Sequence, residues 1–137
     1  MRLLLACLLL TGKFLSAQDL YDRDHSGAFA EFLLKSGQYN LAAIELERLH
    51  FNEPENDSLK IALARAYTLN QSYASALQTL ERMFPAKTSM PNPFSALYAH
   101  NLIAADRFPE AIQWIQHADS LSENQRIWYA GFAYLRQ

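Results

Sequence analysis

Residues 22–27 (DRDHSG) begin like a calcium-binding loop, in which oxygen ligands occupy alternate positions and a glycine in sixth place permits a sharp turn. Such a loop also needs a glutamate in twelfth place, which binds the ion through both carboxylate oxygens. Leu33 occupies that place, so the loop lacks an essential ligand. We therefore expect Asp22 or Asp24 to cap the start of a helix, where carboxylates accept hydrogen bonds from free backbone N–H groups.

Other residues that could do chemistry are scattered along the chain. The histidines are too far apart in the sequence to form the pair, four residues apart on a helix, that binds zinc; they are His25, His50, His100 and His117. The sequence contains no glycine-rich phosphate loop, no nucleophile elbow and no pairing of cysteine with histidine. We therefore expect no cofactor and no metal, and an enzyme would need catalytic residues beyond Gln137.

The composition favours one folded domain. Half of the 137 residues are hydrophobic and 19% are charged, which is enough apolar material for a packed core. The net charge of −2 leaves no basic excess to neutralise a phosphate backbone, so nucleic acid is excluded as an expected partner. The single cysteine excludes an internal disulfide framework and a metal site built from several cysteines.

Residues 1–17 are expected to be a signal peptide, with a basic start at Arg2, an apolar run over residues 3–10 and a small residue, Ala17, at the cleavage site. The mature protein would then be secreted or periplasmic. One alternative is an amphipathic first helix. Another is a lipobox, because residues 4–7 read LLAC and Cys7 would then carry a lipid, although the apolar region before it is short. No segment reaches the roughly 20 apolar residues of a transmembrane helix, so membrane attachment is expected only if Cys7 is lipidated.

A repeat of about 34 residues organises residues 18–137. Apolar or small residues mark the first unit at Phe29, Ala30, Leu33, Tyr39, Ala42, Leu46 and Leu49. They recur 34 residues later as Leu63, Ala64, Tyr67, Tyr73, Ala76, Leu80 and Met83, and after 35 more as Tyr98, Ala99, Leu102, Phe108, Ala111, Ile115 and Ala118. A partial last set is Ala130, Gly131 and Tyr134.

Each unit contains two segments with apolar residues at helical spacing, separated by a short break at residues 37–38, 71–72 or 106–107. This spacing predicts an all-α fold in which each unit is a pair of antiparallel helices. The units run over about 22–56, 57–91 and 92–123, with a partial fourth over 124–137, or about three and a half repeats.

This pattern resembles the tetratricopeptide repeat (TPR) family. The TPR pairs a large with a small residue in its first helix, and the matching pairs here are Phe29-Ala30, Leu63-Ala64, Tyr98-Ala99 and Ala130-Gly131. It also has an aromatic residue after the turn, an alanine three residues on and an apolar residue seven further; these are Tyr39/Ala42/Leu49, Tyr73/Ala76/Met83 and Phe108/Ala111/Ala118. Its terminal proline is present as Pro54, whereas the second unit departs from the pattern, with Pro85 early and a longer connection over residues 89–93.

The resemblance implies an α-solenoid in which the first helices of the units line a concave groove that binds a partner segment. Carried over by position, the groove comprises Glu31, Lys35, Ile61, Arg65, Leu69, His100, Ile103, Trp128 and Phe132, with Leu34, Thr68, Ala104, Leu135 and Arg136 beside them. Alternatively, Ile61, Leu69 and Ile103 pack between helices. One TPR sub-family holds a C-terminal carboxylate with Lys and Asn, but Gly27 and Glu31 occupy those positions here, which disfavours that mode.

From these features we expect an exported interaction module that binds a partner peptide or protein segment in the groove. The alternative is a structural or assembly lipoprotein of the bacterial envelope, of the outer-membrane assembly or glycan-capture type, tethered through Cys7. The last helix has apolar residues on more than one side, namely Trp128, Tyr129, Phe132 and Leu135. Because a terminal cap should have a polar outer face, this favours a truncated chain or a further partner.

Overall fold

The structure is a computed structural model that describes residues 24–86 and 90–136, and these residues are all-helical, without a strand. The helices are α2 (Asp24–Lys35), α3 (Tyr39–Asn52), α4 (Asp57–Leu69), α5 (Tyr73–Met83), α6 (Asn92–Ala104), α7 (Phe108–His117) and α8 (Glu123–Arg136). The all-α prediction is therefore confirmed. The expected signal peptide, a lipid on Cys7 and a cap at Asp22 lie outside the described residues.

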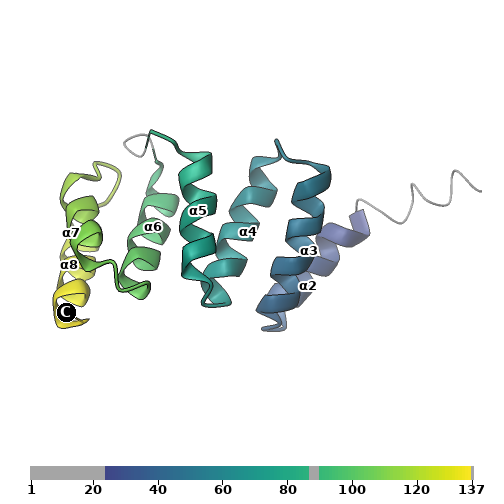
Figure 1. Cartoon of the computed structure of the whole chain (residues 1–137), viewed down its shortest axis with the longest axis horizontal. Helices are drawn as coiled ribbons and strands as arrows, with labels where there is room; N and C mark the ends of the chain where they lie inside the picture. Colours follow the sequence, from purple (N-terminus) through teal and green to yellow (C-terminus); the bar gives the residue numbers. More distant parts are fainter. Residues whose placement is uncertain (1–23, 87–89, 137) are drawn as a thin grey trace, which may run out of the picture.

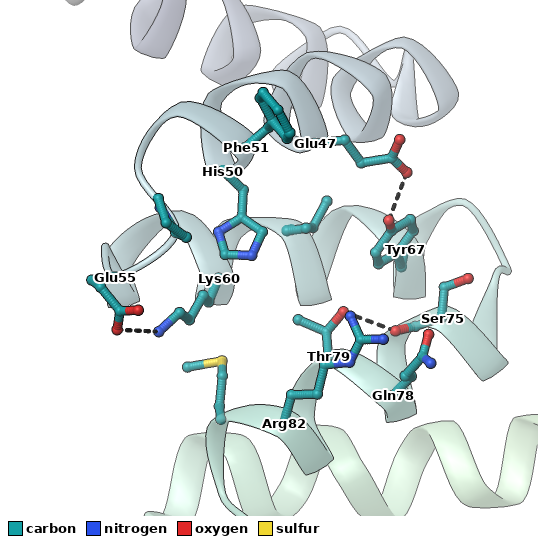
Figure 2. A pocket seen from close by; sticks show the side chains of 13 residues that line it. Glu47, His50, Phe51, Glu55, Lys60, Tyr67, Ser75, Gln78, Thr79 and Arg82 are labelled. Carbon is teal, nitrogen blue, oxygen red and sulfur yellow. Dashed lines mark hydrogen bonds and ion pairs between the residues drawn. The ribbon is translucent and has the colours of Figure 1, made fainter.

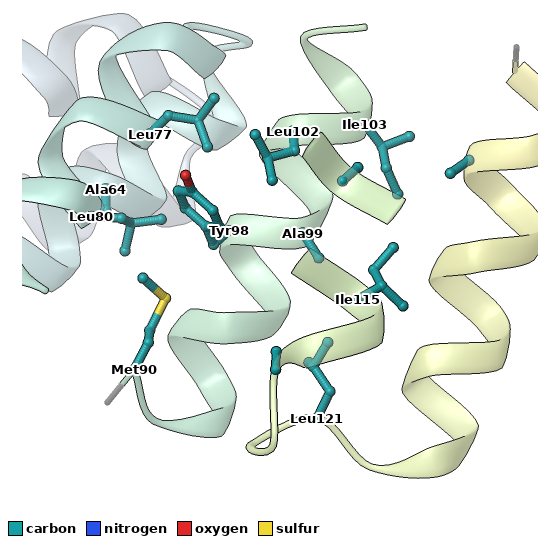
Figure 3. Close-up of a cluster of buried hydrophobic side chains, with 13 residues drawn as sticks. Ala64, Leu77, Leu80, Met90, Tyr98, Ala99, Leu102, Ile103, Ile115 and Leu121 are labelled. Atoms are coloured by element: carbon teal, nitrogen blue, oxygen red, sulfur yellow. The ribbon is translucent and has the colours of Figure 1, made fainter. Parts of the chain in front are cut away.

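The helices follow one another in chain order across Figure 1. Each packs against the next helix in the chain, and α6 also contacts α8. The buried apolar residues accordingly form two clusters, one along α2 to α4 and a larger one along α4 to α8 (Figure 3). The core is thus spread along the row, as expected for a helical-repeat-like arrangement. No helix of the described ranges is long and apolar enough to cross a membrane.

The turns at the predicted breaks share one backbone geometry. Gly37, Gln71 and Asp106 each adopt a positive φ, of 74°, 61° and 57° respectively. In each case the following N–H bonds to the carbonyl five residues back, as in the 2.8 Å bond from Ser72 N to Tyr67 O. This is the Schellman arrangement that ends helices, and it favours glycine because a side chain in the left-handed region is strained. Only the first unit has glycine there.

Small residues lie where the helices cross. Ala30, Ala64 and Ala99 are buried in the first helices of the units, and Ala42, Ala76 and Ala111 are buried in the second helices. A buried alanine lets two helix backbones approach closely, since the distance between helix axes depends on the side chains at the contact. The recurring small residues therefore determine where neighbouring helices meet.

The large-and-small pair expected at Ala130-Gly131 is wrong by two residues. Ala133 has 0% exposure, whereas Gly131 is exposed and an added Cβ there would meet no atom within 4 Å. The large-and-small pair that packs inward is the half-buried Phe132 with the buried Ala133, which follows Tyr98-Ala99 by 34 residues. A helix can turn only one face toward α6 and α7. The face with Tyr129, Phe132 and Ala133 carries two aromatic rings, so its burial removes more apolar surface from water than burial of the glycine face would.

Candidate functional site

A large hollow is lined by α3, α4 and α5 (Figure 2). Its volume is about 810 Å³. It is lined by Glu47, His50 and Phe51 of α3, by Pro54 and Glu55 of the following turn, by Lys60, Leu63 and Tyr67 of α4, and by Ser75, Gln78, Thr79, Arg82 and Met83 of α5. The hollow therefore lies on the side of the second helices of the first two units.

Helical spacing brings these residues to one surface. The three contributions of α4 are three and four residues apart, which places them on a single face of that helix, and the same holds for the residues of α5. Leu63 is buried at the base of the hollow, whereas the Phe51 ring is 86% exposed at its rim. The hollow thus has an apolar base and an aromatic rim.

A hydrogen bond joins two helices of the hollow. The Tyr67 hydroxyl on α4 donates to Glu47 Oε1 on α3 across 2.6 Å, as Figure 2 shows. The pKa of Tyr67 is raised to about 12, chiefly by burial and then by the hydrogen bond to Glu47 and the charge of that carboxylate, while the charge of Arg82 opposes the change. Tyr67 therefore stays a neutral donor, and the Glu47 carboxylate already has a partner.

The two basic residues of the hollow differ in their surroundings. Lys60 Nζ lies 3.1 Å from Asp57 Oδ1 and 3.9 Å from Glu55 Oε2, so two carboxylates already balance its charge. Arg82 has no hydrogen bond or ion pair to any other described residue, although its positive charge acts to lower the pKa of Tyr67. The guanidinium of Arg82 is thus the cation of this hollow that is available to an anionic group.

Two further polar side chains line the hollow. Thr79 Oγ1 donates to the Ser75 carbonyl oxygen on its own helix across 2.9 Å, so its hydroxyl hydrogen is already used within α5. His50 Nδ1 is buried and has no hydrogen-bond partner within the described part of the chain.

A second hollow occupies the equivalent place one unit later. Its volume is about 350 Å³, and its lining is Tyr98, Leu102, Glu110, Gln113, Trp114, His117 and Ala118. These residues follow by 35 positions the α4 and α5 lining residues Leu63, Tyr67, Ser75, Gln78, Thr79, Arg82 and Met83. The hollow is therefore a feature of the repeat.

A lining tyrosine of each hollow donates to a glutamate of the preceding second helix. Tyr98 Oη donates to Glu81 Oε1 across 2.6 Å, and Glu81 follows Glu47 by 34 positions. The second hollow is smaller because Trp114 replaces Thr79: the indole fills the space, donates to the Ser95 carbonyl across 3.2 Å and meets the Tyr98 ring edge-on at 5.0 Å. The first hollow is therefore the roomier of the two.

The groove residues expected on α4 lie away from the first hollow. Ile61, Arg65 and Leu69 are spaced by four residues and occupy the side of α4 opposite to its hollow-lining residues. Arg65 and Leu69 are exposed, and Ile61 is half-buried. On α2, Glu31 and Lys35 are exposed and form an ion pair at 2.7 Å, and the hydrogen bond from Lys35 lowers the pKa of Glu31.

The expected groove residues of α6 are mostly enclosed. Ile103 has 0% exposure and belongs to the core, so the expectation that it lines a groove is wrong for this residue. The reason is that α6 contacts α5, α7 and α8 and has little free surface. His100 is half-buried, and this burial lowers its pKa. On α8, Trp128 is exposed and stacks on Phe132 with ring centroids 5.5 Å apart.

The apolar pattern of the repeat does not indicate the hollow, because apolar positions mark the core and not the polar lining. A signal was nevertheless present in the polar ones: Glu47 recurs as Glu81 and Gln78 as Gln113, at the offsets of the apolar pattern. Recurring polar residues on a second helix indicate a surface that the repeat preserves.

Among the described residues, no group of three or more His, Cys, Asp or Glu side chains is placed to hold a metal ion. The site therefore offers shape, apolar surface and one available cation. Comparison of the chain with family models, with curated proteins and with solved structures finds no match.

Proposed function

We propose that the protein is a helical-repeat interaction module that binds a peptide or protein segment in the hollow between α3 and α5. The observation that carries this proposal is an open hollow of about 810 Å³ in which Arg82 has no partner among the described residues. A concave site with an apolar base and a few convergent polar groups is a common form of binding site.

The lining indicates the chemistry of the partner. Leu63, Met83 and the exposed Phe51 ring offer apolar surface for one side chain of the partner. Arg82 offers the fork of N–H donors that matches a carboxylate. The preferred partner is therefore a segment in which an apolar residue lies close to an aspartate, a glutamate or a free carboxyl terminus.

The hollow needs little ordering before it binds. The bond between Tyr67 and Glu47 joins α3 to α4, and the buried alanines hold the neighbouring helices close. A receptor that is already ordered loses little conformational freedom on binding, which favours affinity.

The architecture and the location are also part of the proposal. We propose a TPR-like solenoid, supported by the recurring residues and by the packing of each helix on the next in the chain. We propose export to the periplasm or the medium, supported by the composition of residues 1–17. Mass spectrometry of the mature protein tests this: a start at Gln18 supports cleavage, whereas a lipid on Cys7 would favour an anchored envelope protein.

The binding proposal is tested with short peptides. A library that combines apolar residues with Asp or Glu is selected against the purified protein, and the affinity of a selected peptide is measured by fluorescence anisotropy. Arg82→Glu should weaken binding at least tenfold, which corresponds to about 1.4 kcal/mol. Arg65→Glu is the matched control, because it makes the same charge change on the side of α4 that faces away from the hollow.

The outcomes separate the two faces of the molecule. Loss of binding in Arg82→Glu with unchanged binding in Arg65→Glu supports the hollow. Loss in Arg65→Glu and in Trp128→Ala alone would place the site in the groove of the first helices. Failure of the library to yield any peptide that binds in a saturable way would contradict the proposed function.

A further inference from the structure

We propose that the second hollow is a second subsite for the same partner, so that one extended segment reaches from the first hollow into the second. This inference rests on the proposed function of the first hollow. The second hollow is lined by α6 and α7, and its volume of about 350 Å³ falls within the usual range for ligand pockets, about 300 to 1,000 Å³. Its occupant is one apolar, uncharged side chain of the segment.

The two hollows open on the same side of the row. Equivalent positions of consecutive units line them, and α5, α6 and α7 follow one another along the row (Figure 1). The junctions between the units are also alike. Glu47 of α3 accepts a hydrogen bond from Tyr67 of α4 across 2.6 Å. Glu81 of α5 likewise accepts one from Tyr98 of α6 across 2.6 Å. A segment that leaves the first hollow therefore reaches the second by crossing α5.

A glutamine recurs in the lining of each hollow. Gln78 lines the first and Gln113 the second, 35 residues later, and both side chains are exposed. Neither side-chain amide makes a hydrogen bond within the described part of the chain. An amide side chain offers both donors and an acceptor, and each peptide unit of an extended segment has one N–H and one C=O to pair with them. The two glutamines are therefore placed to bind the main chain of the segment at points one unit apart.

The charges of the two hollows determine which anchor each one takes. Arg82 brings an available cation to the first hollow, whereas Glu110 brings a carboxylate to the second. Arg107 donates from Nε to Glu110 Oε1 at 2.7 Å, so this carboxylate is already paired. His117 takes the place of Arg82 in the second hollow, and its Nδ1 lies 2.8 Å from the Gln113 carbonyl oxygen, so one ring nitrogen is used within α7. Charge complementarity therefore places the acidic anchor at Arg82.

Apolar groups form much of the second hollow. Trp114 lines it together with Leu102 and Ala118. The indole N–H is already donated to the Ser95 carbonyl oxygen at 3.2 Å, so the ring offers apolar surface to a ligand. An apolar side chain that enters this hollow removes both its own surface and that of the indole from water.

The spacing of the hollows predicts the spacing of the two anchors. Packed neighbouring helices lie about 8 to 10 Å apart, and the second hollow follows the first by two helices, so the hollows are separated by one to two such distances, about 10 to 20 Å. An extended segment advances about 3.3 Å per residue. The apolar anchor should therefore lie about three to six residues from the acidic one.

Fluorescence anisotropy with two sets of peptides tests the second subsite. The short set carries only the acidic and apolar residues that fill the first hollow. The long set adds a leucine at increasing distances from the acid, and the control peptides carry serine at the same places. Leucine should tighten binding at least tenfold over serine when it lies about three to six residues from the acid, because one more apolar side chain is buried.

Gln113→Ala is the variant that reports on the second subsite, because Gln113 is exposed and lines this hollow. It should weaken the leucine peptides about two- to tenfold, the effect of one hydrogen bond, and leave the short peptides unchanged. Gln116→Ala is the matched control: Gln116 is exposed on the same helix but does not line the hollow, so this substitution should change neither set.

Tryptophan emission gives a second readout. The chain has two tryptophans, so in a Trp128→Phe background the signal comes from Trp114 alone. Leucine peptides at the favoured spacing should shift this emission to shorter wavelength, because they exclude water from the indole, whereas serine peptides should leave it unchanged.

Short peptides that bind through Arg82 with no gain from leucine at any distance would overturn the second subsite and leave the proposed function standing. A gain from leucine that neither responds to Gln113→Ala nor shifts the Trp114 emission would place the second anchor elsewhere and overturn the inference. If no peptide of either set binds, the inference and the proposed function both fail.

Discussion

Two substitutions, Gly131→Ala and Ala133→Leu, test which face of α8 packs against the neighbouring helices. Gly131 is exposed within a helix, with open space where a Cβ would be, so alanine should stabilise the fold by about 0.5 to 1 kcal/mol through its higher helix propensity. For a domain of this size the gain corresponds to a rise of about 2 to 4 °C in Tm. Ala133 is fully buried, and leucine there should overpack the contact with α6 and α7 at a cost of about 1 to 3 kcal/mol.

The assay is urea unfolding followed by circular dichroism. The slope of free energy against urea should stay the same in both variants, so that shifts in midpoint report stability. The repeat pattern of the sequence predicts the opposite result, with Gly131→Ala destabilising and Ala133→Leu tolerated, because it places Gly131 where two helices cross closely. Destabilisation by Gly131→Ala together with tolerance of Ala133→Leu would refute the packing described for α8.

Two further predictions concern bonds between helices. The raised pKa of Tyr67 means that the folded protein favours the neutral phenol, so the stabilisation from this group should be complete below pH 10 and decline as the pH rises toward 12. In thermal melts over this range, Tyr67→Phe should show a smaller decline in stability than the unsubstituted protein. An equal decline would contradict the role of the bond to Glu47. Asn101 is buried and donates from Nδ2 to Thr68 Oγ1 at 2.9 Å, so Asn101→Ala should cost about 1 to 3 kcal/mol in urea unfolding, while the exposed control Asn124→Ala should change nothing measurable.

The helix pattern could be predicted from the sequence because it is set locally. The breaks at residues 37–38, 71–72 and 106–107 coincide with turns in which Gly37, Gln71 or Asp106 adopts a positive φ. The alanines that recur with the repeat are buried, since a small residue between two apolar stripes marks a helix crossing. These features depend on neighbours within one unit, which a single sequence contains.

The register of α8 could not be predicted in the same way. Ala130-Gly131 and Phe132-Ala133 both place a small residue at a possible crossing. The choice between them depends on which face buries more apolar surface against α6 and α7, and that is a tertiary property. Ile103 illustrates the same limit, because its burial follows from three neighbouring helices.

The candidate site could not be predicted from the sequence, because it forms only where three helices pack together. Glu47, Tyr67 and Arg82 belong to three different helices, and no sequence spacing brings them together. The resemblance to a known repeat points to the groove of the first helices, whereas the described hollow of about 810 Å³ takes most of its lining from the second helices α3 and α5. The exposed Arg65 and the hollow-lining Arg82 are both arginines on helices, and only the three-dimensional arrangement separates their surroundings.

Amide NMR spectra of the isotope-labelled protein, recorded while a selected peptide is added, would test the location of the site most directly. We predict that the shifted signals come from residues 47–51 of α3, the hollow-facing side of α4 and residues 75–83 of α5. Shifts concentrated at Glu31, Arg65 and His100, with the signals around Arg82 unmoved, would contradict the hollow as the binding site.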